Sequence, residues 1–544
     1  MRILETRQAD GAVPSGKEAS MMQDHELSVN GGAGSTKWDA ADMEKLGMRQ
    51  QTKRRFGLVT ILGFTTTMMC TWESAIPFFF TAFLNGGGPS MLYGYMFAFF
   101  GALATCASMA EMASMYPISG GQYHWVALLA PRRHAKFLSW LTGWLSTLGW
   151  QASASVGTYL GGTIIQSLLV LNKPTYEPKA WQATLIMFAI LLLTLVVNTV
   201  LVRLLPGLEG VVLILHVVGF FAILIPIVHL APISSNAFVW TEFTNLSGYS
   251  SDGLSWFVGQ SATAILFIGY DGACHMAEEV ENAAINVPRA MIFTIFINGA
   301  YGFATYIFIL YCFGNVEETL AAPYGLPFIQ IFYNATQSKA GTTAMISLLL
   351  AMYIFATFGF VASASRQAWA FSRDNGLPLS RFFKRVDARW AIPLYTLALT
   401  GTIDVCLGLI NIGSSVAFNA IVSLVVSSYL SSYLVPIVLM IMKRIKNERV
   451  NFGPWTLGRW GLPINIFAAA YTLLTVVFTF FPPTVVPAVT AVTMNWSCLI
   501  YGGVIILGIV YYALMGHKQY IGPSTELDLG ERARERVTER QDSF

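Results

Sequence analysis

The polar residues best placed for chemistry follow a break in an apolar run. Residues 256–288 read WFVGQSATAILFIGYDGACHMAEEVENAAINVP, in which Gly269, Tyr270, Asp271 and Gly272 interrupt a stretch of membrane-spanning length. An interrupted helix is tolerated at bilayer depth where its freed backbone groups are buried in protein or line a watery cavity. The break therefore predicts a site that binds a small polar solute.

The side chains at this break each allow a functional and a structural interpretation. Asp271 contacts substrate or, as we favour, caps the second half-helix by accepting backbone N–H bonds. Tyr270 is an aromatic lid or a buried tyrosine with a satisfied hydroxyl. His275, one turn after Asp271, relays a proton or makes structural hydrogen bonds. These alternatives stay open in the sequence.

Acidic residues then approach the predicted cytoplasmic end of the same span. Glu278, Glu279 and Glu281 are costly at membrane depth unless they are paired. We expect Glu278 and Glu279 to form an inner gate, with partners among Arg132, Arg133 and Arg289.

A second apolar run carries a similar polar interruption. Within residues 56–84, the segment TTTMMCTWES contributes Thr71, Trp72, Glu73 and Ser74 as candidate substrate contacts. Glu73 pairs with a substrate amine or carries a coupled proton, the alternative being a fixed hydrogen bond within the broken helix. Trp72 holds a cation over its ring or simply packs. His216, in a later run, is a weaker proton-coupling candidate for which a core role is favoured.

Composition places these residues in a membrane protein. Of 544 residues, 54% are hydrophobic and 12% charged, against roughly 25% charged in soluble domains. Apolar runs of about 20 residues, each able to cross the hydrocarbon core, recur along the chain. The six cysteines lack metal or disulfide spacing, and Walker and HExxH motifs are absent. We expect no enzyme activity, metal, cofactor or nucleic acid partner.

Twelve spans are predicted in an all-α integral membrane protein. They cover residues 56–84, 91–112, 137–170, 181–204, 211–230, 256–288, 290–313, 344–371, 392–412, 416–442, 462–481 and 496–515. Residues 1–55 and 516–544 are expected to be cytoplasmic tails, disordered over residues 1–55 and 522–544. An amphipathic piece between spans 2 and 3 is expected along the cytoplasmic surface.

Charge and sequons predict the orientation. With the N-terminus inside, basic residues concentrate in the inner loops, while the outer loops hold only Lys173, Lys179 and Lys339. Three sequons also fall in predicted outer loops and are candidate glycosylation sites, at Asn245, Asn334 and Asn495. We expect a multi-pass protein, in the plasma membrane rather than an organelle.

The two interruptions fall in spans 1 and 6, which are five spans apart. The first ten spans therefore divide into two units, residues 56–230 and 256–442, with residues 462–515 as two additional helices. An odd number of spans inverts the second unit, and paired unwound segments then meet near the midplane. The alternative is that the breaks only mark kinks and close helix packing. Ser363 and Ser365 line a sodium-like site or back-bond to their helix, and Asp404 is an unexplained buried charge.

Four motifs also resemble a known family. They are GYDGACHMAEE, TWES, EMASMYPISGGQYHW and AFSRDNGLP. In this order they are similar to the amino acid/choline branch of the amino acid, polyamine and organocation transporters, especially fungal GABA and choline permeases. The resemblance covers about residues 56–515 and implies a leucine-transporter-like fold with alternating access around spans 1 and 6. Its members carry GABA, choline, other amino acids or polyamines.

We therefore expect a permease for a small amine-bearing solute, coupled to protons rather than to sodium. Its partners are the solute, the coupling ion and the lipid bilayer. The alternatives are an exporter of an alkaloid or other secondary metabolite and a nutrient sensor on the same fold. The sequence leaves the solute, the direction of transport and the oligomeric state open.

Overall fold

The computed structural model describes residues 52–387, 392–413, 417–486, 488–490, 494–520 and 522–523, together with residues 36, 39, 40 and 43. In this part of the chain the secondary structure is helical apart from two isolated bridges, Phe56 with Val280 and Asn85 with Asn245. A helix hydrogen-bonds its own backbone N–H and C=O groups, for which the hydrocarbon of a bilayer offers no partners. The tail predictions for residues 1–35 and 524–544 lie outside the described residues.

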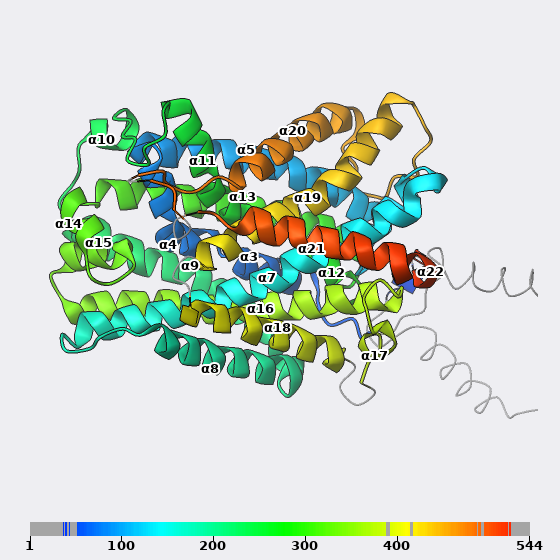
Figure 1. Cartoon of the computed structure of the whole chain (residues 1–544), viewed down its shortest axis with the longest axis horizontal. Coiled ribbons are helices and arrows are strands. Elements are labelled where there is room, and N and C mark those ends of the chain that lie inside the picture. Colours follow the sequence, from blue (N-terminus) through cyan, green and yellow to red (C-terminus); the bar gives the residue numbers. More distant parts are fainter. Residues whose placement is uncertain are drawn as a thin grey trace, which may run out of the picture.

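Ten helices of the described chain are long and apolar enough to cross a membrane. They are α5 (Gly87–Met115), α7 (Arg132–Asn172), α8 (Ala180–Thr199), α9 (Leu205–Leu230), α13 (Ala283–Tyr311), α16 (Lys339–Arg373), α18 (Leu394–Gly413), α19 (Ala417–Ile445), α20 (Gly461–Thr479) and α21 (Ser497–Tyr511), the last continuing through a π-helical turn into α22 (His517–Gln519). The long helices lie side by side in one bundle (Figure 1). This confirms an all-α membrane architecture.

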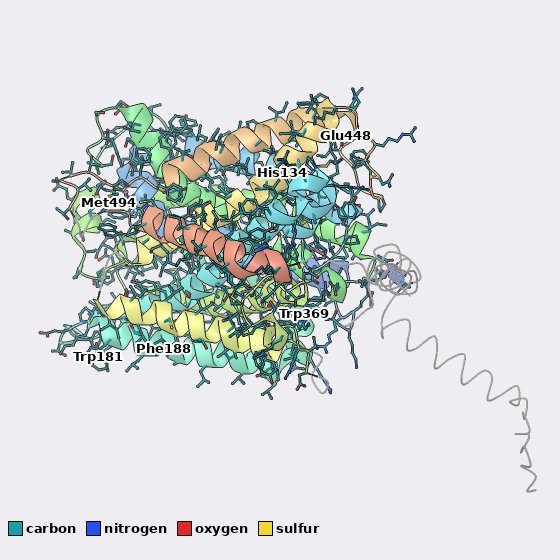
Figure 2. All side chains as sticks on the ribbon, turned by 45° about the vertical axis from the view of Figure 1, so that its right-hand side comes forward. His134, Trp181, Phe188, Trp369, Glu448 and Met494 are labelled. Atoms are coloured by element: carbon teal, nitrogen blue, oxygen red, sulfur yellow. The ribbon has the colours of Figure 1, made fainter. Side chains whose placement is uncertain are left out.

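Large apolar side chains cover the outside of this bundle. On α8, Leu185 and Leu192 are exposed, and Trp181 and Phe188 lie at the periphery in Figure 2. On α21, Leu499 and Leu507 are likewise exposed. An apolar surface of this kind marks contact with lipid rather than water.

Two further membrane-depth segments are divided. α3 (Leu58–Met69) and α4 (Thr71–Leu84) are separated by Cys70, whose left-handed backbone (φ 36°) ends one helix and precedes the next. α11 (Asp252–Ala264) tightens into a 3-10 turn at Ile265–Phe267 and then unwinds, before α12 (Gly272–His275) and a second 3-10 turn at Ala277–Glu279. Ten continuous and two divided segments match the predicted pattern, while the count of twelve and the inversion stay predictions.

The connection between spans 2 and 3 differs from expectation. α6 (Gln122–Leu129) lies between spans 2 and 3 but is largely buried, and it packs against α7 and α19. The surface placement is wrong because six of its eight side chains are in the core. The other connections contain short helices, namely α10 (Asn236–Trp240), α14 (Val316–Ala321), α15 (Pro327–Thr336) and α17 (Ser380–Phe383).

Candidate functional site

Side chains of neighbouring helices hold the break of the first span. The Asn298 amide, from α13, accepts from the Thr71 backbone N–H (3.3 Å) and donates to the Thr66 carbonyl (3.1 Å). It therefore bridges the end of α3 and the start of α4. The Thr71 hydroxyl donates to the Leu266 carbonyl (2.7 Å), just before the break of the other span. The two interrupted helices are thus joined directly.

The start of α4 offers hydrogen-bond donors. The first N–H groups of a helix have no partner within the helix. Those of Thr71 and Ser74 reach the Asn298 side chain and the Cys70 carbonyl. For the N–H groups of Trp72 and Glu73 no acceptor is found within the described part of the chain. A helix N-terminus of this kind favours an anionic group.

Glycine permits the break of the sixth span. Gly269 has φ +104°, which L side chains rarely adopt, and Ile268 before it is extended. Gly272 has no room for a side chain, because an added Cβ would lie 2.0 Å from Cε of Met68 and 3.1 Å from the Trp150 ring. One glycine supplies the backbone turn and the other a close approach between spans 1 and 6.

A cavity lies between the two breaks and three other helices. Its volume is about 40 Å³, which holds roughly three waters at about 10–15 Å³ each. The lining residues are Met69, Cys70, Ser74 and Phe78 from the first span, Ser153, Val156, Gly157 and Leu160 from α7, Ile265 and Ile268 from the sixth span, Tyr353 and Phe360 from α16, and Val425 from α19.

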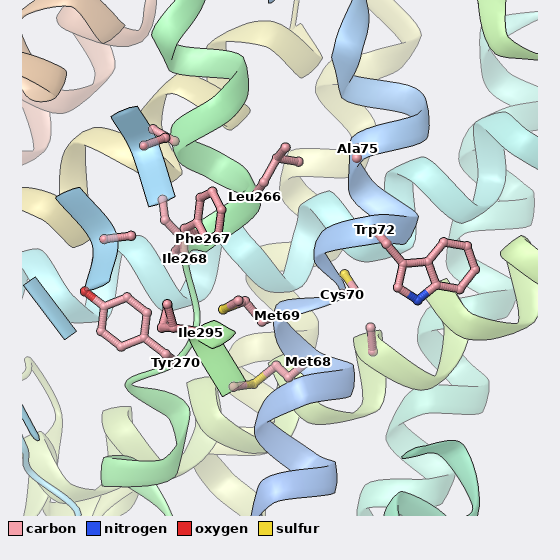
Figure 3. Packing of buried hydrophobic residues seen from close by; sticks show 14 of the residues in the cluster. Met68, Met69, Cys70, Trp72, Ala75, Leu266, Phe267, Ile268, Tyr270 and Ile295 are labelled. Atoms are coloured by element: carbon pink, nitrogen blue, oxygen red, sulfur yellow. The ribbon is translucent and has the colours of Figure 1, made fainter. Parts of the chain in front are cut away.

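Glu73 and Trp72 face away from this cavity. Oε1 of Glu73 lies 2.7 Å from Nδ1 of His216 on α9, and Nε1 of Trp72 lies 3.2 Å from the same Nδ1. Both side chains are fully buried, and the Trp72 ring also packs against Phe220. Figure 3 shows Trp72 on the opposite side of its helix from Ile268. The structure thus brings together Glu73 and His216, two of the three proton-coupling candidates.

Asp271 bonds to other helices instead of capping its own. It occupies the N-cap position of α12 without a side-chain cap bond. Its carboxylate accepts from Nε2 of Gln122 (2.6 Å) and from the Tyr433 hydroxyl (2.6 Å). Nε2 of His275 lies 3.4 Å away, and Nδ1 of His275 lies 2.9 Å from the Ser119 carbonyl. The favoured capping role is therefore wrong, because these partners draw the carboxylate away from the helix start.

Tyr270 is buried beside the same cluster. Its ring packs at 5.6 Å from that of Tyr433, and its hydroxyl lies 3.9 Å from Sδ of Met109. Neither Tyr270 nor Asp271 lines the cavity between the breaks. Both residues therefore pack at the break of span 6 and do not cover the cavity.

The acidic residues after α12 find different arginines from those expected. The Glu278 carboxylate accepts hydrogen bonds from both terminal nitrogens of Arg373 (3.1 and 3.2 Å), and Glu279 pairs with Arg366 (3.1 Å). Both arginines belong to α16. Arg132 and Arg133 are exposed at the start of α7. The expected pairing is wrong because the last turns of α16, rather than the α6–α7 connection, approach this segment.

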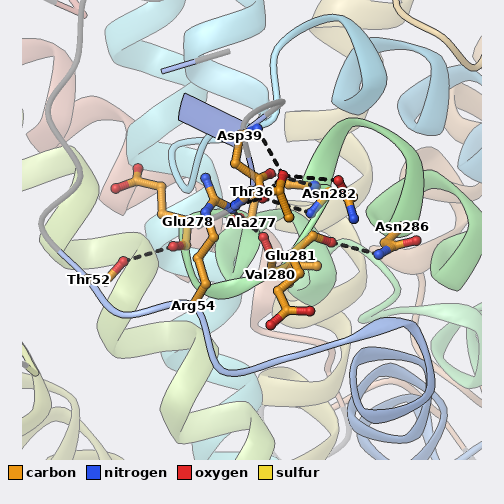
Figure 4. A network of polar contacts seen from close by, with 11 residues as sticks. Thr36, Asp39, Thr52, Arg54, Ala277, Glu278, Val280, Glu281, Asn282 and Asn286 are labelled. Atoms are coloured by element: carbon orange, nitrogen blue, oxygen red, sulfur yellow. Dashed lines mark hydrogen bonds and ion pairs between the residues drawn. The ribbon is translucent and has the colours of Figure 1, made fainter. Parts of the chain in front are cut away.

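The segment before α3 covers the same region. Arg54 donates to the Ala277 carbonyl (3.1 Å) and to that of Val280, and it pairs with Asp39 (3.4 Å). Asp39 in turn accepts from the Asn282 and Ala283 N–H groups at the start of α13, as Figure 4 shows. Residues expected in a free tail are therefore bound to the end of span 6.

Three remaining candidates occupy α16 and α18. The Ser363 hydroxyl lies 3.5 Å from Sδ of Met68, and the Ser365 hydroxyl donates to the Ala362 carbonyl of its own helix (2.8 Å). Asp404 accepts from the Thr158 hydroxyl at 3.0 and 3.1 Å. Ser365 thus back-bonds in this state, and Asp404 joins α18 to α7.

The sequons differ in exposure. Asn245 is partly buried in the connection before α11, and Asn334 is partly buried within α15. Asn495 is buried, and its Nδ2 donates to Ser423, Thr479 and Phe481. The folded chain does not present the Asn495 amide, because all of its donor capacity is used internally.

Sequence reasoning did not single out Asn298 or Gln122 and did not pair Arg366 or Arg373 with the acidic segment. Asn298 and Gln122 are amides in apolar surroundings, and both complete hydrogen bonds at the breaks. A lone amide in a membrane-length run was the available signal for Asn298, since a buried polar group needs partners. The arginine pairings depend on how α16 is placed in space, which composition does not specify.

Comparison with known proteins adds an independent finding. A family model described as amino acid permease matches residues 56–505. A Macrophomina phaseolina protein, provisionally named an amino acid/polyamine transporter, is 32% identical over 80% of this chain and 96% of its own length. The Saccharomyces cerevisiae choline transporter is 29% identical, over 86% of this chain and 82% of its own. Amino-acid permease BAT1 of Arabidopsis thaliana is 28% identical, over 89% of this chain and 96% of its own length.

Proposed function

The chain belongs to the amino acid permease family, and we propose that it is a secondary active transporter of a small amine-bearing solute such as an amino acid, GABA or choline. The observation that carries this proposal is the direct bond between two interrupted helices beside one cavity. Thr71 and Leu266 make that bond, and Met69, Cys70 and Ile268 line the cavity. Unwound helices at a shared site suit a solute with both polar and charged groups.

The proposed solute site is the cavity with the start of α4. The N–H groups of Trp72 and Glu73 donate hydrogen bonds to a carboxylate or another acceptor of the solute. Carbonyls at the breaks and the hydroxyls of Ser74 and Tyr353 accept hydrogen bonds from its amine. Tyr353 and Phe360 supply aromatic surface from α16. A quaternary ammonium finds a favourable surface in these rings. The Trp72 side chain acts through His216 and does not hold a cation over its ring.

The proposed proton site is the Glu73–His216 pair. An indole N–H only donates, so Trp72 requires a lone pair on Nδ1 of His216. The 2.7 Å contact between that same Nδ1 and Glu73 then needs its hydrogen on the carboxyl group. Nδ1 has a single lone pair, so the Trp72 indole and a protonated Glu73 compete for it, whereas a proton on Nδ1 serves Glu73 and leaves the indole without this acceptor. A change in the protonation of this pair therefore changes the contacts at the first turn of α4, which couples protonation to the proposed solute site.

Alternating access follows from how the acidic end of span 6 is held. Glu278 and Glu279 are bound to Arg373 and Arg366, and Arg54 binds the carbonyls of Ala277 and Val280 on either side of them. We propose that this side is cytoplasmic, that the closed pairs form the inner gate, and that they separate on release of solute. The distribution of basic loops supports cytoplasmic termini, and we propose a plasma membrane location.

Competitive uptake tests this proposal in cells that lack their own permeases. GABA, choline, neutral and basic amino acids, and polyamines are compared at two external pH values, with surface expression as the control. We expect saturable uptake of one class that is faster at acid pH. Correctly inserted protein that takes up none of them contradicts import and favours the export or sensing alternatives.

A further inference from the structure

A second cavity opens at the outside of the bundle, away from the transport site. Its volume is about 400 Å³, ten times that of the cavity between the breaks. It lies between α7, α18 and α21, and the chain around α17 forms one end of it. Among the residues that line it are Trp144, Leu148, Phe383, Leu399 and Val504.

The lining of this groove is mostly apolar, and most of its polar side-chain groups are already bonded. The Trp144 indole donates to the Val504 carbonyl (3.1 Å), the Thr147 hydroxyl to the Gly143 carbonyl (2.7 Å), and the Gln151 amide N–H to the Ala364 carbonyl (3.5 Å), while Oε1 of Gln151 is buried without a partner in the described part of the chain. A solute that needs several hydrogen bonds finds few partners here. A hydrocarbon chain fits, because an unfilled apolar void forfeits dispersion contacts.

The end of the groove at α17 is basic. Arg381, Lys384 and Arg385 are exposed, and no ion pair is found for them within the described chain. The guanidinium carbons of Arg381 and Arg385 lie 4.7 and 5.5 Å from the ring of Phe382, the residue before Phe383 of the groove lining. Cationic clusters at the membrane surface attract anionic lipid headgroups.

We propose that an anionic phospholipid binds here, with one acyl chain in the groove and its phosphate against Arg381, Lys384 and Arg385. The lipid comes from the leaflet on the side where α17 lies, the side of α22 and the described chain ends in Figure 1. It contacts α7 and α18 and packs behind the helix that lines the transport cavity. The proposal does not depend on which solute is carried.

Native mass spectrometry of the full-length, delipidated protein tests this site. Phosphatidylglycerol and phosphatidylcholine with identical acyl chains are titrated separately, and ergosterol is the competitor. We expect phosphatidylglycerol to bind at least tenfold more tightly than phosphatidylcholine. Equal affinities, or displacement of phosphatidylglycerol by ergosterol, overturn the proposal.

Variants separate the headgroup from the groove. R381Q/K384Q/R385Q is expected to lower the affinity for phosphatidylglycerol roughly fivefold per charge removed, without disturbing the buried core. The matched control K173Q/K179Q/K339Q removes three exposed charges at the opposite ends of α7, α8 and α16, and we expect no effect. Leu399→Trp fills the groove and is expected to weaken the binding of both lipids. An equal loss in the control, or full binding in both test variants, refutes the site.

Discussion

Replacement of Asn298 by alanine tests whether the break of span 1 must be held open by α13. The variant removes the acceptor of the Thr71 N–H and one donor to the Thr66 carbonyl. Thr66 keeps a partner, because the Cys70 N–H also reaches its carbonyl (3.2 Å). The main cost is therefore one buried N–H without an acceptor, about 1–3 kcal/mol. That corresponds to a fivefold to 150-fold smaller population of the intact break.

The matched control is Asn198→Ala. Asn198 is also fully buried and donates to the Thr194 and Phe358 carbonyls (both 3.1 Å), but it joins α8 to α16 away from the breaks. Thermal unfolding in detergent and solute uptake are measured for both variants. We expect comparable losses of stability but a loss of transport only in Asn298→Ala. Normal uptake by Asn298→Ala, or an equal defect in Asn198→Ala, refutes the reasoning.

The remaining predictions concern the second break and the gate. Gly269→Ala forces a side chain into φ +104° and is expected to cost on the order of 1–3 kcal/mol, so transport falls while membrane insertion persists; full activity contradicts this. Gly272→Ala clashes with Met68, and Met68→Ala in the same chain is expected to restore uptake; failure of that rescue places the defect elsewhere. Arg373→Met removes the guanidinium partner of the buried Glu278 carboxylate, at a cost of about 3–5 kcal/mol. The gate then opens and solute leaks down its gradient in proteoliposomes, whereas addition of Glu278→Gln reduces the leak; tight vesicles with Arg373→Met argue against a gate.

Much of the fold was predictable because the membrane restricts the choices. Apolar runs of spanning length and a Gly-Tyr-Asp-Gly interruption identify helices and one break without any alignment. Gly269 in particular signals a backbone that other residues rarely adopt. The break at Cys70 was less predictable, since nothing in its side chain demands φ 36°. This break is held by hydrogen bonds from other helices, made by the Asn298 side chain and the Leu266 carbonyl.

The side-chain partners were harder to predict than the segments. Glu73 and His216 were each recognisable as costly at membrane depth, but their contact joins residues 143 positions apart. Asp271 was expected to cap its helix because local geometry allows it, yet Gln122 and Tyr433 from other helices bind its carboxylate. Local propensity does not decide such competition; packing of distant helices does.

Glu73→Gln in proteoliposomes tests the central claim most directly. A solute identified by the uptake panel is followed with an imposed pH gradient, acid outside, and by exchange at equal pH. If the Glu73–His216 pair carries the coupled proton, the variant keeps solute exchange but its uptake no longer responds to the gradient. His216→Gln should behave alike. Unchanged acceleration by external acid in Glu73→Gln, at normal protein levels, contradicts the account.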